Sequence, residues 1–200
     1  MAHPLSALGA VHTALSLIPV AAGLVAFARY GRIDPASGIG KVYWGGMLAS
    51  VVTSFGLSST GHFNAGHALG LIVLFVMLVG TLLPRIRLLG RSAVYLQTAA
   101  MSFSFMLLLV PGTNETLTRL PVGHPFATGG IDSPVVKTAL NILFGLFLVG
   151  TAYQMFRLAA QRRRHPVEHL MKISPADGLV CGVGQVNGAL FGPEASRCAA

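Results

Sequence analysis

The sequence predicts an all-α membrane protein, a bundle of five transmembrane helices with the N-terminus outside and the C-terminus in the cytoplasm. Two observations predict this fold: five long apolar segments, and the gathering of most of the 14 Lys and Arg residues after alternate segments. The segments cover residues of about 8–28, 40–58, 67–84, 94–111 and 134–158. Each has, or nearly has, the ~20 residues with which a helix crosses a hydrocarbon layer ~30 Å thick.

Basic residues follow the first, third and fifth apolar segments and are nearly absent from the other connections. All except Arg119 and Lys137 belong to these three groups: Arg29, Arg32 and Lys41; Arg85, Arg87 and Arg91; and Arg157, Arg162, Arg163, Arg164, Lys172 and Arg197. Because cytoplasmic loops of membrane proteins carry an excess of Lys and Arg, this distribution predicts an outside N-terminus and an inside C-terminus.

The composition excludes a water-soluble domain. Only 10% of the residues are charged and 53% are hydrophobic, which leaves too few charges to solvate a chain of this size. The net charge of +8 does not indicate nucleic-acid binding, because the charge lies in the loops and the tail where membrane topology requires it. The run Arg162–Arg164 follows a membrane segment and is typical of a stop-transfer anchor that contacts anionic lipid. We expect the lipid bilayer, and no nucleic acid, as a partner.

Two regions are expected along the chain. Residues 1–160 form the five-helix transmembrane domain, and residues 161–200 form a basic juxtamembrane segment followed by a flexible cytoplasmic tail. The first apolar segment lacks a preceding basic region and is too long for a cleavable signal peptide, so it is expected to remain as a helix. Cys181 and Cys198 fall in the tail, where thiols are normally reduced.

Small residues line one face of the second apolar segment. Gly46, Ser50 and Ser54 recur at four-residue spacing, which places them on the same side of a helix. Because small residues let membrane helices approach closely, this face is expected inside the bundle or against a membrane-protein partner.

Polar residues mark the fourth and fifth segments. Gln97 in the fourth, together with Lys137 and Asn141 in the fifth, is expected to form a polar interior, either for helix packing or for a transport path. Pro111 is predicted to end the fourth helix, followed by an external connection in which Glu115 pairs with Arg119 at i,i+4.

The histidines carry the main chemical signal. His12, His62, His67 and His124 are all expected on the outer side of the membrane. Imidazole is the commonest ligand of transition metals, and a haem b iron can take two imidazoles from facing helices. The pattern therefore predicts a one-sided cofactor site, with His12 and His67 as haem ligands, or a transition-metal site completed by His62 or His124.

Two other interpretations of the histidines stay open. Histidines in such positions are more often interfacial side chains that hydrogen-bond to neighbouring loops, and a quinone-like or proton-handling polar pocket is the third interpretation. The sequence contains neither a His-Glu-x-x-His nor a Cys-x-x-Cys motif. No established metal-binding motif therefore favours the metal site over the other two interpretations.

Several short motifs suggest a group of proteins. His12 early in the first segment, the Gly38–Trp44 entry to the second, the Gly61–Gly70 turn and the stretch Pro111–Pro125 are the residues concerned. With these motifs, residues 8–158 resemble small multi-pass predicted inner-membrane proteins of bacteria of unknown function. The resemblance implies a bacterial inner membrane and assigns no activity.

Three functions are expected from the sequence. The first is a haem- or metal-associated redox component with its histidine site at the periplasmic face. The second is a non-catalytic membrane subunit or assembly factor of a larger complex, which would use the face of Gly46, Ser50 and Ser54. The third is a small transporter or channel that uses Gln97, Asn141 and Lys137.

Overall fold

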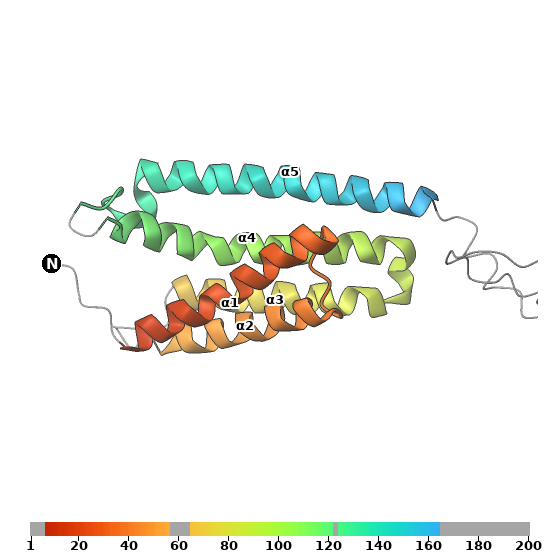
Figure 1. The fold of residues 1–200 in the computed structure, drawn as a ribbon, viewed down its shortest axis with the longest axis horizontal. Coiled ribbons are helices and arrows are strands. Elements are labelled where there is room, and N and C mark those ends of the chain that lie inside the picture. Colours follow the sequence, from red (N-terminus) through yellow and green to blue (C-terminus); the bar gives the residue numbers. More distant parts are fainter. Residues whose placement is uncertain (1–6, 57–64, 122–123, 165–200) are drawn as a thin grey trace, which may run out of the picture. The chain divides into compact units, whose positions relative to one another are not determined.

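The computed structural model describes residues 7–56, 65–121 and 124–164, and all regular structure in these ranges is helical (Figure 1). The described part contains five α-helices: α1 (Ala7–Tyr30), α2 (Gly38–Phe55), α3 (Ala65–Leu82), α4 (Ala93–Arg119) and α5 (Pro134–Arg164). Three short 3-10 helices, η1 (Leu83–Arg85), η2 (Arg87–Ser92) and η3 (Gly130–Asp132), lie before α4 and α5. The prediction of an all-α fold is confirmed.

Four of the described helices are long and apolar enough to cross a membrane. They are α1, α3, α4 and α5, with spans Leu8–Tyr30, Gly66–Arg85, Arg87–Arg119 and Pro134–Arg162. The α2 helix is not among them, because its 18 residues include Lys41 and several Gly, Ser and Thr residues that lower its hydropathy.

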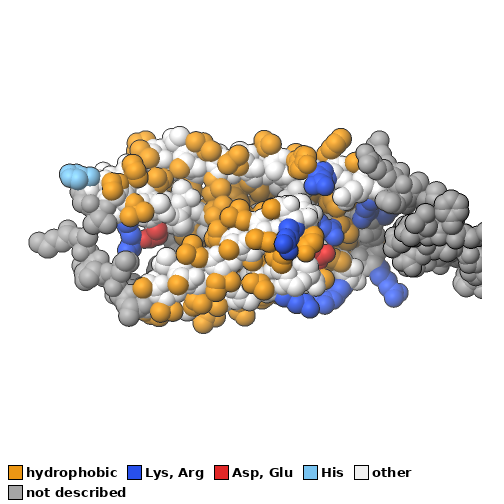
Figure 2. Space-filling view, in the orientation of Figure 1, with side chains coloured by type: hydrophobic (Ala, Val, Ile, Leu, Met, Phe, Trp, Pro, Cys, Tyr) orange, Lys and Arg blue, Asp and Glu red, His pale blue; other side chains and the backbone are white. Residues whose placement is uncertain are grey.

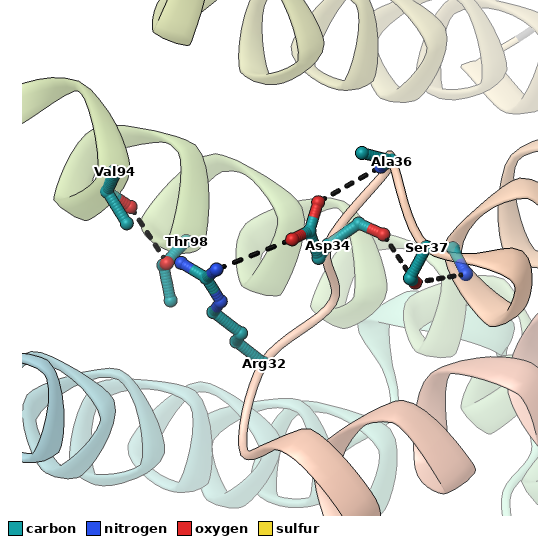
Figure 3. Close-up of polar contacts among 7 residues, drawn as sticks. Arg32, Asp34, Ala36, Ser37, Val94 and Thr98 are labelled. Atoms are coloured by element: carbon teal, nitrogen blue, oxygen red, sulfur yellow. Dashed lines mark hydrogen bonds and ion pairs between the residues drawn. The ribbon is translucent and has the colours of Figure 1, made fainter. Parts of the chain in front are cut away.

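The connection between α1 and α2 is held by its own polar groups (Figure 3). The carboxylate of Asp34 accepts a hydrogen bond from the Ala36 amide at 3.0 Å and from Arg32 at 3.4 Å. Ser37 is the N-cap of α2: its hydroxyl donates to the Asp34 carbonyl at 2.7 Å and accepts from the Gly40 amide at 3.0 Å. This capping satisfies a helix-end amide, which explains why α2 begins directly after Ser37.

The row of small residues on α2 packs against α1 of the same chain. A Cβ atom on Gly46 would lie 2.8 Å from Cδ of Pro19, so only glycine permits this approach. One turn further, the hydroxyls of Ser50 and Ser16 lie 2.6 Å apart. This part of the row is therefore covered within the chain, and a membrane-protein partner on the same helix stays a prediction.

The core lies among the first four helices. Tyr43 of α2 is fully buried, and its hydroxyl lies 2.8 Å from the Ser104 hydroxyl of α4. Phe27 of α1 meets Phe105 of α4 edge to face, with ring centroids 5.2 Å apart. Three methionines fill the remaining space between the helices: Met47, Met77 and Met101.

The α4 helix does not end at Pro111, as the sequence predicted, but continues to Arg119. Proline removes a single intrahelical hydrogen bond, a loss that membrane helices tolerate when the remaining backbone groups are satisfied. Beyond Pro111, the hydroxyl of Thr116 donates to the Gly112 carbonyl at 2.7 Å. The predicted ion pair of Glu115 with Arg119 is present on this extended helix.

The α5 helix packs sparsely against the other helices. Only 6% of its most apolar stretch is buried, and side chains make its contacts with α4 and η2. Phe147 lies 5.7 Å from Phe103 between ring centroids, and Arg162 donates to the Arg91 carbonyl at 3.0 Å. Long side chains therefore bridge a space between α5 and its neighbours.

The chain divides into two units, residues 1–162 and residues 163–200. Most of the second unit lies outside the described residues, and with it the tail that the sequence predicted to be flexible.

Candidate functional site

His12 is held by α2 through one of its two ring nitrogens. Its Nδ1 atom lies 2.9 Å from the Thr53 hydroxyl oxygen. That hydroxyl donates to the Ala49 carbonyl at 2.9 Å or the Ser50 carbonyl at 3.0 Å, so its single hydrogen is already used. A hydroxyl that donates to either carbonyl accepts from Nδ1–H of His12, and in that tautomer Nε2 carries the lone pair. The Ser16 hydroxyl lies 3.5 Å from this Nε2 atom.

His67 is held by the next residue of α2 but through the opposite ring nitrogen. Its Nε2 atom lies 3.2 Å from the Ser54 carbonyl, which can only accept, so Nε2 carries the hydrogen. The ring stacks on Phe55 with centroids 4.6 Å apart, and the side chain is buried. Nε2 of His67 is therefore not a metal ligand while this hydrogen bond is made.

The structure brings only part of the predicted histidine set to one helix. His12 and His67 both contact the last turns of α2, whereas His124 is exposed in the connection after α4. His62 lies outside the described residues. Within the described ranges, no three His, Cys, Asp or Glu side chains gather where they could hold a metal ion. The haem or metal site stays a prediction.

The three residues of the predicted polar interior differ in their exposure within the described chain. Gln97 is buried on α4, but Asn141 and Lys137 are exposed on α5. Lys137 instead forms an ion pair of 3.3 Å with Asp132, just before α5. Asn141 and Lys137 therefore lie on a side of α5 that the described chain does not cover, and the polar interior expected of them with Gln97 stays a prediction.

A cleft of about 420 Å³ lies between α1, α4 and α5. Most of its wall is apolar: Phe27, Phe105, Met106, Leu109, Leu143, Leu146 and Phe147. The polar lining is contributed by Ser102, Thr151, Tyr153, Gln154 and Arg157. The volume falls in the range of small-molecule sites, and a mainly apolar wall with a few polar groups is typical of them.

Two glycines in the lining leave this space open. A Cβ atom on Gly150 of α5 would meet no atom within 4 Å. Gly31 follows α1 with φ of 71° and donates its amide hydrogen to the Phe27 carbonyl at 3.0 Å. This is the left-handed residue that commonly ends a helix, and here it leaves room for the Arg157 guanidinium. A Cβ on Gly31 would lie 3.2 Å from Nη1 of Arg157.

Two hydrogen-bonding groups in the cleft lining, the amide nitrogen of Gln154 and the hydroxyl of Thr151, lack partners among the described residues. The Ser102 hydroxyl donates to Oε1 of Gln154 at 2.7 Å, and both residues are buried. This bond uses the oxygen of Gln154, whereas no described residue accepts from its amide nitrogen. The Thr151 hydroxyl is buried and also has no hydrogen-bond partner among the described residues.

A small recess adjoins the cleft. It measures about 20 Å³ and shares Gly31, Gln154 and Arg157 with the cleft, while Arg32 and Gln161 add further polar atoms. The recess holds about one water-sized group, and it lies at the ends of α1 and α5 where basic residues gather (Figure 2). The combined site is thus apolar over most of its wall and rich in cationic and amide donors around the recess.

Sequence reasoning did not find this site. Gln154 was a usable signal, because it is an amide within a long apolar segment, where polar side chains usually have a helix partner or a ligand. Arg157 was interpreted only as a topology determinant. Nothing in the linear pattern indicated that Ser102 of α4 would meet Gln154.

Comparison of the chain with protein-family models, with curated proteins and with solved structures finds no match in any of the three. What the protein does is therefore inferred from the cleft and the histidines of this chain.

Proposed function

We propose that the chain is a five-span protein of the bacterial inner membrane, with its N-terminus outside and its C-terminus in the cytoplasm. Four spans are the long apolar helices, and α2 is the fifth: its 18 residues extend ~27 Å and it packs between α1 and α3. Figure 2 supports the orientation, because Lys and Arg gather toward one end of the described helices.

Ion pairs increase the difference in net charge between the two ends of the described helices. At the opposite end, Arg119 pairs with Glu115 and Lys137 pairs with Asp132, so both cations are neutralised locally. Among the described residues of the basic end, only Arg32 has a carboxylate partner, Asp34. The uncompensated positive charge is thus concentrated on one side, which the positive-inside rule assigns to the cytoplasm.

We propose further that the protein binds an amphiphile from the membrane, with the hydrocarbon part of the ligand in the cleft between α1, α4 and α5. The observation that carries this proposal is the cleft of about 420 Å³, apolar along most of its wall and lined by unpartnered donors near Gln154. Burying an apolar chain there excludes water from the wall, while the donors orient the polar end. Of the interpretations made from the sequence, the quinone-like polar pocket is the closest to this amphiphile-binding cleft. The cleft, however, is lined by α1, α4 and α5 and not by the histidines.

Photocrosslinking tests the proposal. The full chain is reconstituted in bilayers of phosphatidylglycerol and phosphatidylcholine that carry a diazirine in one acyl chain. We expect adducts on Met106, which lines the cleft and is buried from bulk lipid, and on Phe147. Gly150→Leu fills open space in the cleft and is expected to reduce these adducts at least fivefold.

Gly145→Leu is the matched control. Gly145 lies on the same helix, its added side chain likewise meets nothing within 4 Å, and it does not line the cleft. Adducts on Met106 that are equal in wild type and Gly150→Leu, or that fall equally in Gly145→Leu, would contradict an acyl chain in the cleft.

A second candidate function is the haem- or metal-associated redox component predicted from the sequence. It is favoured by one observation: Thr53 accepts from Nδ1–H of His12, so Nε2 is the basic nitrogen. A hydrogen bond of this kind on the distal nitrogen commonly fixes the tautomer of a metal-bound imidazole. Absorption spectra of the oxidised and dithionite-reduced protein, with metal analysis, test it. Loss of a Soret band or of stoichiometric metal in His12→Ala is the expected result, and a colourless, metal-free wild-type protein contradicts it.

A further inference from the structure

We infer that the ligand of the cleft is an anionic phospholipid, whose phosphate is bound by Arg157 and the Gln154 amide and whose ester carbonyl accepts from Thr151. This inference rests on the proposed function of the cleft and specifies its ligand. It follows from the hydrogen-bonding capacity of three α5 residues that lie within two turns of one another.

Gln154 presents only donors to a ligand. Its side chain is about nine-tenths buried, and its Oε1 atom already accepts from Ser102. The remaining amide group has two hydrogens and no acceptor among the described residues. Since Gln154 lines both the cleft and the recess, an acceptor placed where the two join would satisfy it.

Arg157 adds a charge at the same place. Its guanidinium lies 5.8 Å from the Tyr153 ring centroid and next to Gly31, and no described carboxylate pairs with it. Arg32 also lines the recess, but its charge is shared with Asp34 (Figure 3). The lining of both spaces contains no Asp or Glu, so a cationic head group would meet only repulsion there.

Thr151 identifies a second contact along the ligand. Its hydroxyl lies three residues before Gln154, about one helical turn deeper in the apolar segment, and is buried without a partner among the described residues. A change of the Thr151 rotamer, of which helices allow two, brings the hydroxyl to the cleft that the residue lines. A buried, unpaired hydroxyl is destabilising until an acceptor reaches it. A phospholipid has its ester carbonyls between the phosphate and the hydrocarbon chains, which matches the order Arg157, Thr151 and apolar wall.

The whole chain, purified in a neutral detergent, is titrated with phosphatidylglycerol, phosphatidylcholine or oleic acid, all with oleoyl chains, and bound lipid is counted by native mass spectrometry. Both lipids carry a phosphate, but the quaternary ammonium of phosphatidylcholine meets Arg157 and Arg32 without a carboxylate in the lining, which supports a preference of about tenfold for phosphatidylglycerol. Arg157→Gln is expected to remove this preference, and Arg157→Lys to keep most of it. Arg87→Gln, an exposed basic residue outside both spaces, is the control and is expected to change nothing.

Further variants and ligands test the ester contact, the anionic head group and the cleft one by one. Thr151→Val is expected to weaken both phospholipids severalfold and to leave oleic acid unaffected, because oleic acid has no ester carbonyl. Equal affinity of the wild type for both phospholipids overturns the anionic head, while the cleft proposal survives if Gly150→Leu still weakens them. Oleic acid binding as tightly as phosphatidylglycerol overturns the phospholipid assignment. If Gly150→Leu changes none of the affinities, the cleft proposal fails as well.

Discussion

The hydroxyl of Ser102 on α4 donates a hydrogen bond of 2.7 Å to the side-chain oxygen of Gln154 on α5, and both residues are buried. On a helix that touches its neighbours sparsely, this bond is one of the few side-chain contacts on the side of α5 that faces the bundle. It also leaves the amide hydrogens of Gln154 without an acceptor among the described residues, so one contact links the packing of α5 to the proposed site.

The Ser102–Gln154 bond is expected to stabilise the bundle by about 1 kcal/mol, in the range of interhelical hydrogen bonds in membranes. Ser102→Ala and Gln154→Leu should each lower the free energy of unfolding, and the double variant should lose less than the sum. Unfolding in mixed micelles by SDS titration measures the cycle. Additive losses would show that the two side chains do not interact.

Gly46→Leu is expected to destabilise the protein by about 1–3 kcal/mol, because its side chain must displace Pro19 of α1. The preceding residue offers a matched control. A Cβ on Gly45 meets nothing within 4 Å, so Gly45→Leu should leave the free energy of unfolding nearly unchanged. Similar losses in both variants would contradict the close α1–α2 approach at Gly46.

His12 of α1 and His67 of α3, which both contact α2, are expected to be opposite tautomers. His12 donates from Nδ1 to Thr53, whereas His67 donates from Nε2 to the Ser54 carbonyl. Nitrogen-15 NMR of histidine-labelled protein distinguishes the two. Thr53→Val removes the acceptor of His12 and should alter the His12 signals alone, so a change at His67 of the same size would argue against this arrangement.

Asn141→Leu is expected to change the free energy of unfolding by less than about 0.5 kcal/mol, as for exposed sites without special contacts. Asn141 is exposed on α5, and no described residue hydrogen-bonds its amide. SDS titration alongside Gln154→Leu gives the comparison. A loss above about 1 kcal/mol would mean that Asn141 has a partner outside the described chain, as a subunit of a larger complex would.

The orientation predicts the behaviour of a fused reporter. A reporter that is active only in the periplasm, joined after Lys172, should be inactive because the proposed orientation places the basic end of the helices in the cytoplasm. The same reporter inserted after Gly129, between α4 and α5, should be active. The reverse pattern would overturn the topology.

The local sequence determined the helices and several of their ends. Long apolar segments produced α1, α3, α4 and α5, and the small residues of α2 predicted a closely packed face, although not that α1 would be the neighbour. Ser37 begins α2 as its N-cap, and Gly31 follows the last residue of α1. These features depend on neighbouring residues alone, so composition and capping chemistry are sufficient to predict them.

Only the tertiary structure decided how α5 is turned. Lipid and the interior of a helical bundle are both apolar, so a membrane helix carries little periodic contrast to indicate its buried face. For this reason the sequence pattern did not indicate that Gln154 would be buried within the described chain, whereas Asn141, three turns or more away on the same helix, is exposed there. The cleft follows from that rotation together with the missing side chains of Gly31 and Gly150, a combination that exists only once α1, α4 and α5 are packed.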